Sequence, residues 1–171
     1  MANIQQHTET NDKTLEIDSS APGTIVRIAL AAESVVNVFM AASMIFNPIK
    51  NFENTYLTDG QPVVSQTASL SQQFGPSILA MTVPMMLALP NKPGAIELRR
   101  ISYQILSAYE ILAVPITLWQ AWVAGEAGSG LNFNKVIWGL TVPMGVALGF
   151  RAWVLFLKPE WMGKYKTKRD D

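Results

Sequence analysis

The chain has 171 residues, of which 49% are hydrophobic and only 15% are charged. Soluble domains carry charges on about a quarter of their residues, so this composition argues against disorder and against an ordinary water-soluble domain. The 13 basic and 13 acidic residues balance to a net charge of zero, which predicts no nucleic-acid partner. The absence of cysteine excludes disulfides, thiol nucleophiles and thiolate metal ligands.

Residues 1–23 are polar and are predicted to form a disordered N-terminal tail. They lack the basic start and early apolar core of a secretory signal. The only histidine, His7, lies in this tail, so no haem, zinc or di-iron site is expected. We predict no metal and no cofactor, and we expect the methionines to face lipid or to fill gaps.

Four apolar segments follow, each close to the roughly 20 residues that a helix needs to cross a bilayer. They cover residues 24–46, 72–89, 101–123 and 136–157. The last three contain Pro84, Pro115 and Pro143, which membrane helices tolerate because neighbouring groups satisfy the freed carbonyls. The sequence therefore predicts an all-α, four-helix transmembrane bundle over residues 24–157, within a multi-pass integral membrane protein. Residues 49–69 are predicted to form a long loop with at most one turn, and 125–134 a glycine-rich turn.

Lysine and arginine predict the orientation. With four spans, both termini and the loop around residues 90–100 share one side of the membrane. Ten basic residues lie on that side and two, Lys50 and Lys135, on the other. The positive-inside rule then places both termini in the cytoplasm, with residues 158–171 as a basic cytoplasmic tail. We expect an internal membrane such as the endoplasmic reticulum.

Glu33, Glu110 and Arg151 lie within the predicted spans at similar depth. A charge at the centre of a membrane helix costs about 2.5–3.5 kcal/mol, so it usually faces the bundle interior and has a partner. Asn37 lies one helical turn from Glu33, and Tyr103 lies two turns from Glu110. We predict that these five side chains face one intramembrane pocket.

The first hypothesis is that this pocket binds or transforms a lipophilic small molecule, as a cyclase or isomerase in a biosynthetic pathway. Glu110 would be the protonated acid and Glu33 the base or cation stabiliser, while Arg151 sets their ionisation. Asn37 and Tyr103 would position the substrate. The alternative is that these side chains only hold the helices together, at ~0.6–2 kcal/mol per contact. A proton or ion path is a third interpretation, but no ladder of acids supports it.

Gly145 and Gly149 form a GxxxG motif, which lets two helices approach closely. Gly149 and Arg151 lie about 200° apart around a helix, so an inward Arg151 predicts an outward glycine face. That face predicts a homodimer or another assembly partner, and packing within the chain is the alternative. The matching functional hypothesis is a non-enzymatic membrane scaffold or assembly subunit.

Over residues 25–166 the chain resembles small uncharacterised fungal membrane proteins with four predicted spans. The shared features are Leu89-Pro90-Asn91, Glu97-Leu98-Arg99-Arg100, Tyr109-Glu110, Arg151 and Pro159-Glu160-Trp161. The resemblance implies the fold but no activity. In size and span number the chain is also similar to DoxX-type proteins and to fungal anthrone oxygenases. It departs from the anthrone oxygenase pattern at Asn47-Pro48-Ile49, where the first helix ends.

Overall fold

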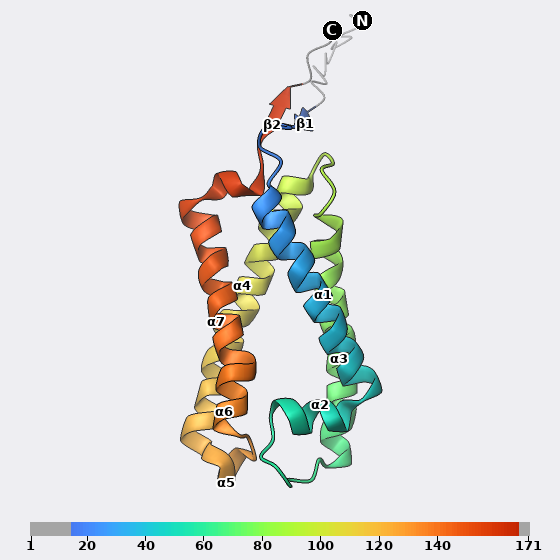
Figure 1. The fold of residues 1–171 in the computed structure, drawn as a ribbon, viewed down its shortest axis with the longest axis vertical. Helices are drawn as coiled ribbons and strands as arrows, with labels where there is room; N and C mark the ends of the chain where they lie inside the picture. Colours follow the sequence, from blue (N-terminus) through green and yellow to red (C-terminus); the bar gives the residue numbers. More distant parts are fainter. Residues whose placement is uncertain (1–14, 168–171) are drawn as a thin grey trace, which may run out of the picture.

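The computed structural model describes residues 15–167, and their regular structure is almost entirely helical (Figure 1). The long helices are α1 (Thr24–Phe46), α3 (Ser65–Leu87), α4 (Ala95–Trp119) and α7 (Val142–Ala152). The short ones are α2 (Pro48–Thr55), α5 (Gly125–Ser129) and α6 (Phe133–Val136). Three π-helical segments, η1 (Gln120–Ala124), η2 (Ile137–Thr141) and η3 (Trp153–Leu157), continue the helices around them, and a 3₁₀ turn, η4 (Pro159–Met162), follows. The prediction of a helical protein is confirmed, with one addition, a two-stranded ribbon of β1 (Leu15–Ile17) and β2 (Tyr165–Thr167).

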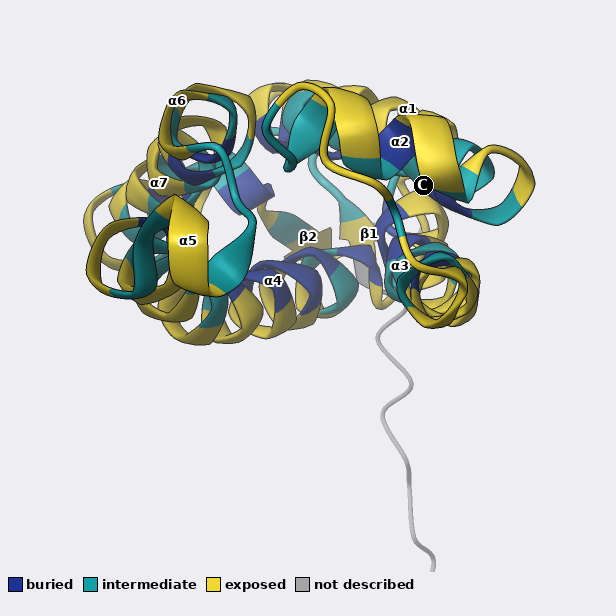
Figure 2. Ribbon diagram, turned by 90° about the horizontal axis from the view of Figure 1, so that it is seen from below, coloured by how far each residue is buried: buried dark blue, intermediate teal, exposed yellow. Residues whose placement is uncertain are grey.

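The long helices pack as two pairs, α1 against α3 and α4 against α7, and α3 also contacts α4 (Figure 1). Viewed from one end, buried residues lie on the inner faces of the helices and exposed residues on the outer faces (Figure 2). The main apolar core includes Val26, Leu30, Met85, Tyr103 and Val154. It lies toward the end that carries the strands, because α1 begins and α3 ends there.

Three helical stretches among the described residues are long and apolar enough to cross a membrane: Thr24–Phe46, Ala95–Ser129 and Phe133–Leu157. No more than 28% of the most apolar window of each is buried inside the chain. Helix α3 does not belong to this set, because its first nine residues, SQTASLSQQ, are mostly polar. The structure is thus consistent with an integral membrane protein that has three candidate spans.

Several helix boundaries differ from the sequence prediction. Helix α3 begins at Ser65 instead of near residue 72, and α4 begins at Ala95 instead of residue 101. Hydropathy marks only the apolar part of a helix, and polar residues continue both helices beyond it. The predicted loop 49–69 contains α2, which starts with Pro48 at a position where proline favours helix formation. The predicted turn 125–134 contains α5 and the start of α6.

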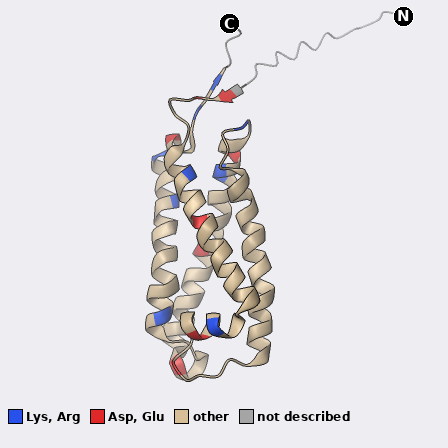
Figure 3. Ribbon diagram, turned by 45° about the vertical axis from the view of Figure 1, so that its right-hand side comes forward, with Lys and Arg blue, Asp and Glu red and all other residues tan. Residues whose placement is uncertain are grey.

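The predicted disordered tail is partly ordered. Residues 1–14 lie outside the described part of the chain, but β1 pairs antiparallel with β2, with Glu16 opposite Lys166. The predicted basic tail contains η4 and β2, and its residues 168–171 lie outside the described part. Both described ends therefore meet at one end of the molecule (Figure 1). Lys, Arg, Asp and Glu concentrate at the two ends, and few interrupt the helices between them (Figure 3).

Arg99 joins four segments at the end that carries the strands. Its Nε donates to the carbonyl of Ala88 at 3.0 Å, and Nη1 donates to the carbonyls of Pro22 at 3.1 Å and Met162 at 2.7 Å. Its Nη2 donates to the side-chain oxygen of Asn91 at 2.6 Å. The residue is fully buried, although no carboxylate accepts any of these hydrogen bonds. It fixes the start of α1 and the end of α3 against η4.

Gly23 makes this close packing possible. Its φ of +72° is in the left-handed region that favours glycine. A Cβ at this position would lie 2.5 Å from the Met162 carbonyl oxygen and 2.6 Å from Nη1 of Arg99. The chain therefore needs glycine here for both backbone conformation and space.

Candidate functional site

Glu33 on α1, Glu110 on α4 and Arg151 on α7 meet between the helix pairs. Arg151 donates from Nη2 to Oε2 of Glu33 at 2.8 Å and from Nη1 to Oε2 of Glu110. Arg151 is 3% exposed and Glu110 is 6% exposed, while the Glu33 side chain retains 24% exposure. The structure thus brings together the three charged residues that the sequence analysis singled out. We refer to them below as the charge cluster.

The charge cluster is not balanced. Two carboxylates and one guanidinium sum to −1 when all three groups are ionised. Unbalanced charge is costly in a buried site of low dielectric. The cluster can relieve that cost by holding one proton on a carboxyl group or by accepting a cation.

Tyr103 supports Arg151 from the apolar core. Its ring centre lies 5.9 Å from the guanidinium carbon, in a cation–π contact, and the residue is fully buried. Its hydroxyl group has no hydrogen-bond partner among the described residues. Tyr103 does not line the cavity described next, so the structure places it behind Arg151 and not in the predicted substrate-contacting position.

A cavity of about 380 Å³ lies beside the charge cluster, within the ~300–1,000 Å³ range of small-molecule sites. Helices α1, α3, α4 and the η2–α7 segment all contribute to its wall. Glu33, Glu110 and Arg151 line it, and so does Asn37, whose Nδ2 lies 3.7 Å from Sδ of Met85. The remaining lining is mostly apolar and includes Met40, Met44, Met81, Met144, Tyr56, Phe74, Ile78, Leu106, Tyr109, Leu140 and Ala147.

Some of this lining was not anticipated from the sequence. Four methionines that we expected to face lipid or to fill gaps line the cavity. Tyr56 reaches it from just after α2, in the segment predicted to be a loop. On the η2–α7 segment, Pro143 has no N–H to donate to the carbonyl of Gly139, and the backbone at Gly139 is π-helical. Both of these residues line the cavity, so the irregular turn shapes its wall.

Gly145 and Gly149 lie on an exposed face of α7. No atom of the described residues comes within 4 Å of a Cβ built at either position, beyond the helix's own backbone. Helix packing within the described part of the chain therefore does not use this motif. The face is open to the surroundings of the molecule.

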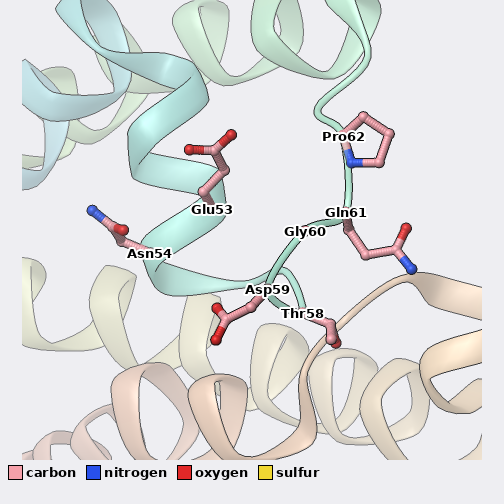
Figure 4. Close-up of a pocket in the computed structure, with 7 residues that line it drawn as sticks. All are labelled: Glu53, Asn54, Thr58, Asp59, Gly60, Gln61 and Pro62. Atoms are coloured by element: carbon pink, nitrogen blue, oxygen red, sulfur yellow. The ribbon is translucent and has the colours of Figure 1, made fainter.

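A second hollow, of about 400 Å³, lies at the end opposite the strands and is lined by Glu53, Asn54 and residues 58–62 (Figure 4). Nζ of Lys135 lies 2.7 Å from Oδ1 of Asp59 and 2.9 Å from the carbonyl of Glu53. Hydrogen bonding to Lys135 and its positive charge lower the pKa of Asp59. Residues 15–167 contain no group of three histidine or acidic side chains placed to hold a metal ion. This hollow is a polar loop surface that one ion pair ties to α6.

Comparisons with protein-family models, with curated proteins and with solved structures gave no match. The resemblance to small four-span membrane proteins therefore stays a prediction.

Proposed function

We propose that this chain is a multi-pass membrane protein of four spanning helices, whose central cavity binds or transforms a lipophilic small molecule. The observation that carries the proposal is the position of the charge cluster on the wall of an otherwise mostly apolar cavity. A cluster that served only to hold helices together would need no adjoining space. The apolar lining suits a hydrocarbon body, and the charged groups supply orientation or chemistry.

The outer surface supports a membrane location. Large apolar side chains such as Phe39, Phe46, Trp122 and Phe156 are at least 74% exposed. Water-soluble monomers rarely expose continuous apolar patches above a few hundred Å². Helix α3 is proposed as the fourth span because it packs along α1 and exposes Val83 and Leu87 on its apolar half.

The span number and the cytoplasmic location of both termini can be tested together, because the chain has no cysteine. A single cysteine replaces Gln61 in one variant and Lys92 in another. Four spans place these positions on opposite sides, so an impermeant maleimide should label only Lys92→Cys from the cytoplasmic side. Labelling of both variants from one side would show that α3 does not cross. The expected internal membrane is tested by imaging a tagged chain.

The charge cluster is suited to acid–base chemistry. Glu110, the more buried acid, would hold the proton and donate it to the substrate, and Glu33 would accept a proton from another atom. An isomerisation or cyclisation of this kind leaves the composition of the substrate unchanged. The site resets when a proton moves between two carboxyl groups that share Arg151. Asn37 on the cavity wall would position the substrate.

Binding is tested by blocking the cavity. Ala147 lines it, while the adjacent Val146 is 69% exposed on the outer surface. Native mass spectrometry of purified protein should find a co-purifying small molecule in the wild type and in Val146→Trp but not in Ala147→Trp. Equal occupancy in the two tryptophan variants would show that the ligand does not use this cavity.

The catalytic roles are tested with Glu33→Gln and Glu110→Gln in isolated membranes incubated with a cellular lipid extract. Each variant should abolish any product that wild-type membranes form, and Glu53→Gln, an exposed acid on α2, should not. Unchanged products in both cavity variants, at normal expression, would reject acid–base catalysis.

The open GxxxG face supports a second candidate function, an assembly subunit or homodimer. Leucine at Gly145 or Gly149 should abolish chemical crosslinking of a dimer in membranes. Ala80→Leu, which enlarges an exposed residue of α3 that lies outside both the motif and the cavity, is the control. Crosslinking that persists in the motif variants would exclude this face as the interface.

A further inference from the structure

We infer that the cavity takes a lipophilic cation: an amine or quaternary ammonium ion attached to a hydrocarbon or aromatic body. This inference rests on the proposed small-molecule site and narrows the ligand class. It is carried by the charge, the exposure and the composition of the cavity lining.

The first reason is the charge of the lining. Among the described residues, Glu33, Glu110 and Arg151 are the charged ones that line the cavity, so the ionised lining carries a net charge of −1. Arg151 already uses one terminal nitrogen for each carboxylate. Within residues 15–167, no further lysine, arginine or histidine lines the cavity to cancel the remaining charge. A ligand with one positive charge would take the place of the proton that Glu110 holds in the acid–base proposal, and so would balance the ionised cluster.

The second reason is which charged group a ligand can reach. The Glu33 side chain keeps 24% of its surface exposed, against 4% for Arg151. Glu33 accepts the hydrogen bond from Arg151 through Oε2, and the residue lines the cavity. A ligand therefore meets a carboxylate before it meets the guanidinium. A lipophilic anion, such as a fatty acid, would instead face repulsion from Glu33.

The third reason is the chemistry of the uncharged lining. Tyr56, Phe74 and Tyr109 bring aromatic rings to the cavity, and the Phe74 and Tyr109 ring centres lie 6.5 Å apart. Aromatic faces attract organic cations, and methionine sulfur is polarisable and adapts to irregular shapes. Four methionines share the lining. These groups suit the weakly hydrated, alkyl-substituted cation of an organic amine better than a strongly hydrated metal ion.

The test uses two probes of one shape. One is a tritiated 6-phenylhexyl-trimethylammonium ion, and the other is its uncharged analogue, in which a tert-butyl group replaces the trimethylammonium group. Binding to the full-length protein in phosphatidylcholine nanodiscs is measured by scintillation proximity, with empty nanodiscs subtracted. We expect the cation to bind at least about tenfold more tightly than the neutral probe. Ala147→Trp should abolish the binding of both probes, and Val146→Trp should leave it unchanged.

Glu33→Gln preserves the shape of the side chain but removes its charge. It should reduce the preference for the cation to about unity, whereas Glu53→Gln should keep the wild-type preference. Equal affinity of the two probes in the wild type would overturn the inference and leave the proposed cavity standing. Binding of neither probe would count against the proposed function as well. If Glu33→Gln fails to fold, the comparison of the two probes on wild type and Ala147→Trp still decides the question.

Discussion

Two buried arginines have different roles in this protein. Arg99 sits at the end that carries the strands and donates to three backbone carbonyls and one amide oxygen. Arg151 sits between the helix pairs and contacts two carboxylates on the wall of a cavity. Every terminal and Nε group of Arg99 has an acceptor, whereas Nε of Arg151 has none among the described residues. An arginine whose side-chain nitrogens all donate to neutral acceptors has a structural role. We call Arg99 and its acceptors at residues 22, 88, 91 and 162 the Arg99 joint. An arginine beside a cavity with a side-chain nitrogen left unpaired by the described residues, such as Arg151, indicates a candidate functional site.

This contrast predicts different responses to substitution. The carbonyls around Arg99 cannot change their protonation state, so removing the arginine leaves buried acceptors unsatisfied. The carboxyls around Arg151 can be replaced by neutral amides of the same shape. Substitution of Arg99 should therefore always lower stability. Neutral substitution of all three residues of the charge cluster should preserve stability but abolish function.

The largest expected effect is that of Arg99→Met. Loss of four hydrogen bonds at a fully buried site should lower the free energy of unfolding by about 4 kcal/mol or more. Thermal unfolding of the purified protein, followed by tryptophan fluorescence, measures the change. Arg100→Met is the matched control, because Arg100 is the next residue and is exposed. Equal stability of the two variants would show that the hydrogen bonds of Arg99 do not stabilise the fold.

Arg151→Met should lower the free energy of unfolding by about 3 kcal/mol, because it leaves two carboxyl groups without their shared partner. The triple variant Glu33→Gln, Glu110→Gln, Arg151→Met should recover to within about 1 kcal/mol of the wild type. The same triple variant should not discriminate the cationic probe from the neutral one. A triple variant as unstable as Arg151→Met alone would indicate that the cluster is mainly structural, and the contrast with Arg99 would disappear.

A smaller effect is expected at Gly23. Gly23→Ala places a Cβ against both Met162 and Arg99, at a residue with positive φ. It should lower the free energy of unfolding by about 2 kcal/mol. Gly60→Ala is the control: Gly60 has a φ of +84° but nothing within 4 Å of the added Cβ, so about 1 kcal/mol of backbone strain is expected. The difference in unfolding midpoint isolates the packing around Arg99. Equal losses of stability in Gly23→Ala and Gly60→Ala would mean that the packing around Arg99 can adjust to an added Cβ.

The smallest effect is expected from Asp59→Asn, which breaks an exposed ion pair with Lys135. The folded-state pKa of Asp59 lies below its usual value of 3.8, so the pair stabilises the fold above that pH. This contribution is lost as the pH falls through the lowered pKa. The small difference in unfolding midpoint between wild type and variant should therefore be present at about pH 6 and vanish in strong acid. A difference that grows with acidity would contradict this sign.

The sequence predicted the charge cluster because lipid constrains charged side chains strongly. Once residues 24–46, 101–123 and 136–157 were recognised as apolar helices, Glu33, Glu110 and Arg151 had to converge or face hydrocarbon. Their depths followed from the helical rise alone. The helical class and three candidate spans were predictable on the same grounds.

The Arg99 joint was not predictable from the sequence. In the sequence, Arg99 is one of ten basic residues that predict the orientation and part of a motif shared with the small membrane proteins that the chain resembles, but nothing there identifies it as a structural contact. Its acceptors are mostly backbone carbonyls, which any residue type provides. The methionine lining was equally hidden, since methionine is as compatible with lipid as with a cavity wall. Helix α2 was missed because its polar sequence carries no apolar periodicity beyond two turns.

The acceptors of Arg99 also impose an order on biosynthesis. They come from residues 22, 88, 91 and 162, so the last of them leaves the ribosome well after the other three. Until then α1, α3 and α4 can form and pair, but the guanidinium lacks the Met162 carbonyl. A nascent chain that stops before η4 should therefore stay recognisable to quality-control proteases, and this vulnerability should end once η4 packs against Arg99.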